Sequence, residues 1–167
     1  NPSLKLFMIA KFKGYNLHWK TGKDHLLITS VGTGRRPRNL NIEKYKNPNN
    51  LQLAQIVADV FMSDSTEFIE LMMQSMSSSL TARVIDREIG DLNGDLIGGV
   101  EQFTYNRFNT FFEVDKMKEI GLDYTDEQLD SISEMDNADN TDDLIQIGLA
   151  SGKKFVNEQH FPSAFDL

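Results

Sequence analysis

The stretch Leu26–Leu27–Ile28–Thr29–Ser30–Val31, followed by Gly32–Thr33–Gly34, decides the fold class of this 167-residue chain. Its first six residues form a continuous run that is mostly apolar and β-branched, and the two glycines close it. Such a run is typical of a strand that is buried on both faces within a parallel sheet. Together with the helical patterns around it, this strand predicts an α/β fold.

The segments on either side of this strand have the periodicity and capping residues of helices and of further strands. From Leu51 onward, apolar residues recur every three or four positions, and a polar break divides the pattern into two helices near Ser63–Asp64–Ser65. The other expected elements are a helix over Ser3–Phe12 capped by Ser3, a short strand over Thr81–Ile85, a strand over Phe103–Asn109, a helix over Asp126–Met135 capped by Thr125, and a helix over Thr141–Glu158 capped by Thr141.

The composition is that of an ordinary globular protein, with 40% hydrophobic and 25% charged residues, and we expect residues 1–167 to form a single domain or subdomain. The chain has no cysteine, which excludes disulfide scaffolds, thiolate zinc sites, iron–sulfur clusters and cysteine nucleophiles. This absence weakly favours a cytoplasmic location. No apolar run approaches the roughly 20 residues that span a bilayer, so we expect no transmembrane segment.

Charge is distributed unevenly along the chain. Residues 1–50 carry a net charge of +8 and the remaining residues carry −16, which gives −8 overall. An acidic surface repels phosphate, so we expect no nucleic-acid partner. The basic front is compatible with three surroundings: an anionic membrane surface, an acidic partner, or the acidic rear of the same fold.

The sequence lacks the usual catalytic and metal-binding motifs. It contains no Gly-x-Ser, and its histidines, His18, His25 and His160, are not spaced to hold a metal on one helix face. Asp91–Asp95 begins like a calcium loop, but Leu96 occupies the glycine position and Gln102 the glutamate position. We therefore expect no catalytic residue, metal or cofactor in this chain.

Two neighbouring features are candidates for ligand contact. Gly32 and Gly34 follow the strand, where their N–H groups are candidates for an oxyanion or phosphate cradle, although a tight turn explains the same glycines. The basic residues that follow are candidate contacts for anionic lipid headgroups, with a solvated loop as the alternative. They are Arg35, Arg36, Arg38, Lys44 and Lys46.

Four methionines in the helical region have two interpretations. Thioether side chains adapt to irregular apolar shapes, so they suit a groove for an acyl chain, but they also commonly fill cores. These residues are Met62, Met72, Met73 and Met76.

Several blocks of the chain, taken in order, resemble the patatin-like phospholipases, which are lipid acyl hydrolases with a serine–aspartate dyad. The matching blocks are Asn1–Pro2 before an apolar helix, Leu17–His18–Trp19, Thr21–Gly22, Leu26–Gly34, Asp86–Leu92, Phe103–Asn109 and His160–Phe161–Pro162. The resemblance implies a patatin-like α/β/α sandwich with helices packed on a small, mostly parallel sheet and a carboxyl-terminal half rich in helix.

In that family the Asn–Pro block closely follows an Asp-Gly-Gly/Ala motif that supplies the general base, and the nucleophilic serine lies earlier in Gly-x-Ser-x-Gly. Neither motif is present here, so no catalytic residue of the family falls on any position of this chain. The resemblance therefore implies the carboxyl-terminal part of a hydrolase of lipid esters, inactive alone, with the upstream half or a second copy as partner. The alternative is a non-catalytic interaction domain that uses its acidic helices, for example Asp123–Asp143, as a binding surface.

Overall fold

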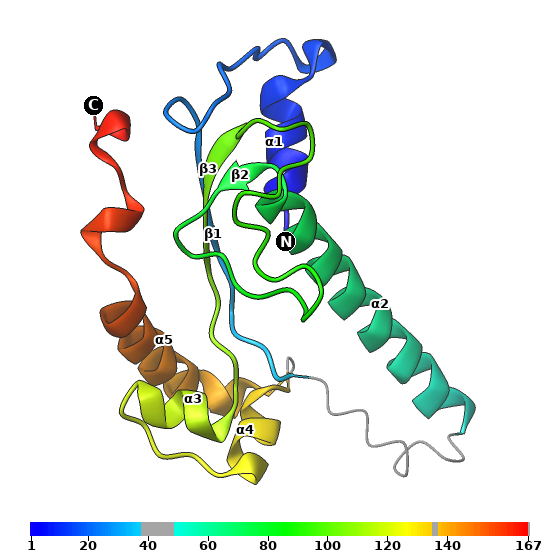
Figure 1. The fold of residues 1–167 in the computed structure, drawn as a ribbon. Coiled ribbons are helices and arrows are strands. Elements are labelled where there is room, and N and C mark those ends of the chain that lie inside the picture. Colours follow the sequence, from blue (N-terminus) through cyan, green and yellow to red (C-terminus); the bar gives the residue numbers. More distant parts are fainter. Residues whose placement is uncertain (38–48, 135–136, 167) are drawn as a thin grey trace. The chain divides into compact units, whose positions relative to one another are not determined.

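The computed structural model describes residues 1–37, 49–134 and 137–166. Figure 1 shows helices together with a small sheet of three parallel strands, which is the α/β fold that the sequence predicts. The elements in chain order are α1 (Ser3–Lys11), η1 (Lys13–Tyr15), β1 (Leu27–Val31), α2 (Asn50–Gln74), β2 (Ser77–Ser78), β3 (Phe103–Phe108), α3 (Val114–Glu119), α4 (Asp126–Ile132), η3 (Ala138–Asn140), α5 (Thr141–Phe155), η4 (Glu158–His160) and η5 (Ser163–Phe165).

The described residues group into two compact units. The first unit contains those of Asn1–Ser30, Asn39–Asn106 and Ser163–Leu167, and the second contains those of Val31–Arg38 and Arg107–Pro162. Nothing in this grouping tests the expectation of a single domain, which stays a prediction.

The sheet has the strand order β1–β3–β2, so β3 is central and β1 is an edge strand. Strands β2 and β3 run parallel, with Ser77 opposite Phe103 and Ser78 opposite Thr104. Along β1, Ile28 and Ser30 are buried, whereas Thr29 and Val31 are exposed. The expectation that both faces of this strand are buried was therefore wrong, because an edge strand with one uncovered face alternates in burial.

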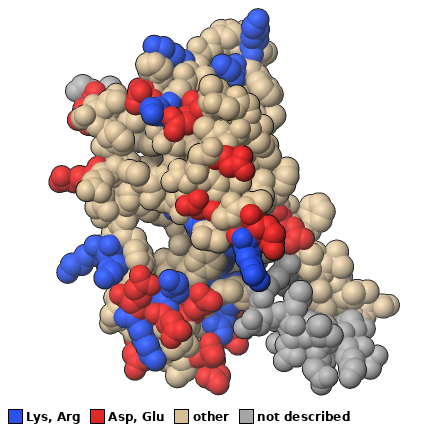
Figure 2. Space-filling model, in the orientation of Figure 1, with Lys and Arg blue, Asp and Glu red and all other residues tan. Residues whose placement is uncertain are grey.

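In Figure 2, blue side chains lie at the top of the view, where Figure 1 shows α1 and the loop that follows it, and other blue side chains lie among red ones lower in the view. Residues 1–23 contain five lysines and no acidic residue. Five of the ten basic residues in residues 1–50 thus lie within residues 1–23, which the structure describes in full.

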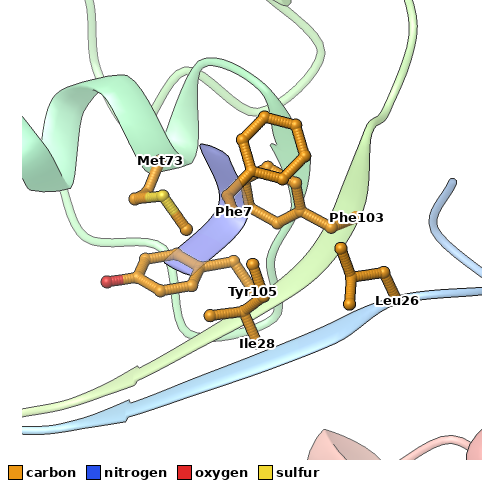
Figure 3. Close-up of a cluster of buried hydrophobic side chains, with 6 residues drawn as sticks. All are labelled: Phe7, Leu26, Ile28, Met73, Phe103 and Tyr105. Carbon is orange, nitrogen blue, oxygen red and sulfur yellow. The ribbon is translucent and has the colours of Figure 1, made fainter. Parts of the chain in front are cut away.

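The core of the first unit lies where α1 and α2 cover β1 and β3. Figure 3 shows Phe7 of α1 and Met73 of α2 directed toward side chains of the two strands. The Phe7 and Phe103 rings lie 4.6 Å apart between centroids. The full set of buried residues is Phe7, Leu26, Ile28, Met73, Phe103 and Tyr105.

The four methionines of α2 and its end have different surroundings. Met73 is fully buried in this core and Met76 packs against it, whereas Met62 is half exposed. Met72 is half-buried. The core interpretation therefore holds for Met73, and the acyl-groove interpretation stays a prediction.

The second unit has its own core, formed mainly by α3, α4 and α5. Met117 and Leu129 are fully buried at its centre. The buried set is Phe112, Met117, Tyr124, Leu129, Ile132 and Ile147.

The expected helix break and one expected strand were wrong, and the expected Thr141 cap was also wrong because Asn140 is the N-cap of α5 and Thr141 is its first helical residue. Helix α2 continues without interruption through Ser63–Ser65, and no strand forms over Thr81–Ile85. Thr125 caps α4, as expected, by accepting from the N–H of Gln128 at 3.3 Å. Among the described helices, none has the combination of length and apolar character that is needed to cross a membrane.

Candidate functional site

The turn after β1 runs beside the segment that follows β3. The N–H of Gly32 donates to the carbonyl of Phe108 at 2.8 Å, and the N–H of Gly34 donates to Oδ1 of Asn109 at 3.0 Å. The N–H of Arg35 then donates to the carbonyl of Thr110 at 2.9 Å. The sheet-like pairing therefore extends beyond the ends of both strands.

Both glycines are required by close packing. A Cβ atom at Gly32 would overlap the Asn109 side chain, and one at Gly34 would overlap the Phe112 ring. Gly34 also has φ = +89°, a conformation that side chains disfavour. These contacts explain why glycine occupies both positions of the turn.

The same hydrogen bonds bear on the candidate oxyanion cradle. An oxyanion donor must point its N–H toward the reacting group, but the N–H groups of Gly32 and Gly34 already donate to Phe108 and Asn109. A tight turn accounts for the geometry in full. The cradle stays a prediction that would require these bonds to be released.

Arg36 is held by protein acceptors. Its Nη2 donates to Asp126 at 2.8 Å, its Nε donates to Asp130 at 2.5 Å, and its Nη1 donates to the carbonyl of Phe112 at 2.6 Å. Burial alone lowers the pKa of Arg36, but hydrogen bonds and charge from Asp126 and Asp130 outweigh burial and raise it. Arg36 thus ties the turn to the start and middle of α4.

The other candidate headgroup residues have different outcomes. The guanidinium of Arg35 lies over the Phe111 ring, with 4.9 Å between Cζ and the centroid, which is the geometry of a cation–π contact. Arg38, Lys44 and Lys46 lie outside the described residues. The structure therefore engages Arg35 and Arg36 within the protein, and their contact with headgroups stays a prediction.

A polar cluster at Asn1 was not found by sequence reasoning. Oδ1 of Asn1 accepts from the N–H and hydroxyl of Ser3, at 3.1 and 2.7 Å, and from the hydroxyl of Ser30 at 3.3 Å. Its Nδ2 donates to the Tyr105 hydroxyl at 3.4 Å. Asn1, and not Ser3, therefore supplies the side-chain acceptor at the start of α1.

The cluster is built from three separate elements. Ser30 is the penultimate residue of β1, and Tyr105 comes from the centre of β3. Ser3 and Ser30 are buried and Tyr105 is fully buried. The only sequence signal was the polar pair Thr29–Ser30 within a strand whose other residues are apolar.

A buried ion pair joins α2 to the irregular segment after β2. Nε of Arg83 lies 2.8 Å from Oε1 of Glu70, whose side chain is buried. Nε2 of Gln74 donates to the carbonyls of Arg83 and Asp91, both at 2.9 Å. Because these groups satisfy one another, we assign this network a structural role.

The histidines and carboxylates of the described residues form no metal centre. His160 is buried and accepts from the N–H of Asn157 at 3.3 Å, so it takes part in the cap of η4. In the part of the chain that the structure describes, no group of three or more His, Asp or Glu side chains is placed to hold a metal ion.

Comparisons with protein-family models, with curated proteins and with solved structures found no match to this chain.

Proposed function

We propose that this chain is the carboxyl-terminal part of a patatin-like hydrolase that cleaves the carboxylic ester bonds of lipids. The proposal starts from the ordered blocks that resemble the family, from Asn1–Pro2 to His160–Phe161–Pro162. The α/β fold, with helices on a small parallel sheet, is compatible with that resemblance.

The observation that carries the proposal is the position of Asn1. In the family, the catalytic aspartate lies shortly before the Asn–Pro block. Here the side chain of Asn1 bonds to Ser30, next to the carboxyl end of β1. Ligand sites of open α/β sheets lie at the carboxyl ends of strands. An aspartate a few residues ahead of Asn1 would therefore lie near the end of the sheet where chemistry is expected.

Exposed apolar surface on the first unit is a second support. Helix α2 exposes a row of apolar side chains, among which Phe61 is 75% exposed, and β1 is an edge strand. Further layers of an α/β/α sandwich would cover such surfaces. The row consists of Leu53, Val57, Phe61 and Phe68.

The reaction of the proposed parent needs three groups together, namely a serine hydroxyl, an aspartate base and donors for the oxyanion. The serine oxygen attacks the ester carbonyl and passes its proton to the aspartate, and the leaving alkoxide takes that proton as the acyl-serine forms. Water then gives a proton to the aspartate as it attacks the acyl-serine carbonyl, the bond between the acyl group and the serine oxygen breaks, the serine oxygen takes that proton, and the fatty acid leaves. Because we place the serine and the aspartate ahead of Asn1, we expect the 167-residue chain alone to be inactive.

The test is to read the coding sequence ahead of Asn1 and to assay the complete protein on a short-chain ester and on phospholipid. We expect a Gly-x-Ser-x-Gly motif followed by Asp-Gly-Gly/Ala, and covalent labelling by a fluorophosphonate. Replacing the motif serine with alanine should lower the rate by about 10⁶. A reading frame that starts within a few residues of Asn1, or a complete protein without esterase activity, would overturn the proposal.

A second candidate function is binding of a basic partner by the acidic helices of the second unit. The side chains of Asp126 and Asp130 are 70% and 71% exposed, which favours it. However, both carboxylates bind Arg36, and Asp143 accepts from the Tyr124 hydroxyl at 2.7 Å. These internal contacts reduce the charge that is available to a partner, so we rank the hydrolase proposal first.

A further inference from the structure

The ten residues from Lys11 to Lys20 are all exposed, although five of them are apolar or carry a ring: Phe12, Tyr15, Leu17, His18 and Trp19. Trp19 is 57% exposed, and Phe12, Tyr15 and Leu17 are 45–49% exposed. Single exposed apolar residues are common, but four within eight positions form an unusual surface. We call residues 11–20 the basic aromatic loop.

The loop has a defined backbone. The N–H of Trp19 donates to the carbonyl of Ala10 at 3.0 Å, and the N–H of Tyr15 donates to the carbonyl of Phe12 at 3.0 Å. Asn16 and His18 adopt left-handed conformations, with φ of 58° and 50°, which turn the chain back beside α1. The apolar side chains are thus presented by an ordered backbone.

Lysines alternate with these residues along the chain, and one lysine contacts a ring. Nζ of Lys5 lies 3.0 Å from the Tyr15 hydroxyl and 5.5 Å from the centroid of its ring, and Nζ of Lys11 donates to Thr21 at 3.1 Å. Lys13 and Lys20, within the loop, are both exposed. The blue side chains at the top of Figure 2 belong to this end of the first unit.

The charge of this segment differs from that of the rest of the chain. Residues 1–23 have five lysines and no acid, whereas residues 24–167 have a net charge of −13. An anionic surface would therefore repel most of the chain and attract this segment. The charge difference therefore favours contact with such a surface through residues 1–23.

We propose that the basic aromatic loop docks the protein on an anionic lipid surface, with Phe12, Tyr15, Leu17 and Trp19 at the headgroup level and Lys13 and Lys20 facing the phosphates. Tryptophan and tyrosine prefer the membrane interface because their rings are amphipathic. Apolar contact and lysine attraction together give the two signals that stable peripheral binding requires. The inference goes beyond the proposed hydrolase and holds without any catalytic activity.

Trp19 is the only tryptophan of the chain, so its fluorescence reports on the loop directly. The 167-residue chain is mixed with vesicles of phosphatidylcholine alone, or of equimolar phosphatidylcholine and phosphatidylserine. We expect flotation with the anionic vesicles, a blue shift of the Trp19 emission, and quenching by a nitroxide on the acyl chain near the headgroup. Added salt should weaken binding, because it screens the lysines.

Matched variants separate charge from apolar contact. Lys13→Gln with Lys20→Gln should lower the partition coefficient about 30-fold, since each lysine contributes about a fivefold factor near an anionic surface. Lys153→Gln with Lys154→Gln removes the same charge from an exposed part of α5 and should leave the partition coefficient unchanged. Phe12→Ala with Trp19→Ala should lower the partition coefficient, measured by flotation, roughly tenfold. All positions are exposed, and an unchanged circular dichroism spectrum verifies folding.

If the basic aromatic loop binds something other than lipid, the measurements will differ, and each such result overturns the proposal. A second copy would produce a dimer that the Phe12→Ala, Trp19→Ala variant dissociates, without vesicle binding. A protein surface in the complete parent would shield Trp19 there from acrylamide before lipid is added. Binding to anionic vesicles without nitroxide quenching of Trp19 would locate lipid contact elsewhere, whatever the outcome of the esterase assay.

Discussion

At the scale of single residues, Tyr124 links a buried core to a carboxylate. Its ring is part of the core of the second unit, and its hydroxyl donates to Asp143 at 2.7 Å. Burial, and then the hydrogen bond and negative charge of Asp143, raise the pKa of Tyr124 from 10.0 to about 12. The neutral phenol is therefore the form that the folded chain favours.

This shift predicts how stability changes at alkaline pH. Because the pKa of Tyr124 is higher in the folded chain, its contribution is fully present below about pH 10 and is lost as pH rises toward about 12. We expect the free energy of unfolding to fall by about 1–2 kcal/mol over this interval. Tyr124→Phe should lack this part of the decline, as measured by urea unfolding at a series of pH values.

Tyr15→Phe is the matched control for this prediction, because the Tyr15 ring is exposed and its hydroxyl accepts from Lys5. It removes one phenol without touching the core, so it should keep the alkaline decline of the parent chain. An identical decline in Tyr124→Phe would show that other groups cause it.

At the scale of elements, the sequence predicted the type of most segments but not their burial or ends. Continuous β-branched residues indicated β1, and alternating aromatic residues indicated β3. The break expected at Ser63–Ser65 was wrong because serine and aspartate on an exposed helix face disfavour helix only slightly, by well under about 1 kcal/mol each. A free-energy cost this small does not interrupt a helix when the residues on both sides of it favour the helical state.

The candidate site was less predictable than the elements, for a physical reason. The glycine pair at 32 and 34 indicated a turn, but the partners of Arg36 are 90 and 94 positions away along the chain. A local pattern cannot distinguish an arginine that binds distant carboxylates from one that faces solvent. The same holds for Asn1, whose contacts with Ser30 and Tyr105 join separate strands.

Arg36 is the residue on which the packing of the turn against α4 should depend. Arg36→Ala removes two ion pairs with exposed carboxylates and one hydrogen bond to the Phe112 carbonyl. The pairs contribute little because solvent screens them, so we expect a total loss of about 1–2 kcal/mol in the free energy of unfolding. Urea unfolding measures it, and added salt should reduce the difference from the parent chain.

Arg87→Ala is the control for this change, since it removes the same charge from an exposed arginine. It should alter the free energy of unfolding by less than about 0.5 kcal/mol. Equal effects of the two variants would mean that net charge, and not the contacts of Arg36, determines the loss.

At the scale of the whole molecule, the boundary between positive and negative charge along the sequence does not coincide with the boundary between the two compact units. The positive segment, residues 1–23, belongs to the first unit, which also exposes the apolar row on α2. The second unit contains its own core and the ion pairs of Arg36 with Asp126 and Asp130. The lipid contact and the surroundings of the catalytic aspartate, as we propose them, both fall on the first unit.

The two cores have no residue in common, and this predicts that they can be weakened separately. Leu129 is fully buried in the second core, so Leu129→Ala should cost about 2–5 kcal/mol there. Because proteins open in local cooperative units, amide hydrogen exchange should become faster in α3, α4 and α5 while α1 keeps its protection. Phe7→Ala, in the first core, should produce the reverse pattern. If either substitution accelerates exchange equally in both sets of helices, the two units unfold as one cooperative body, and the separation of their cores has no energetic consequence.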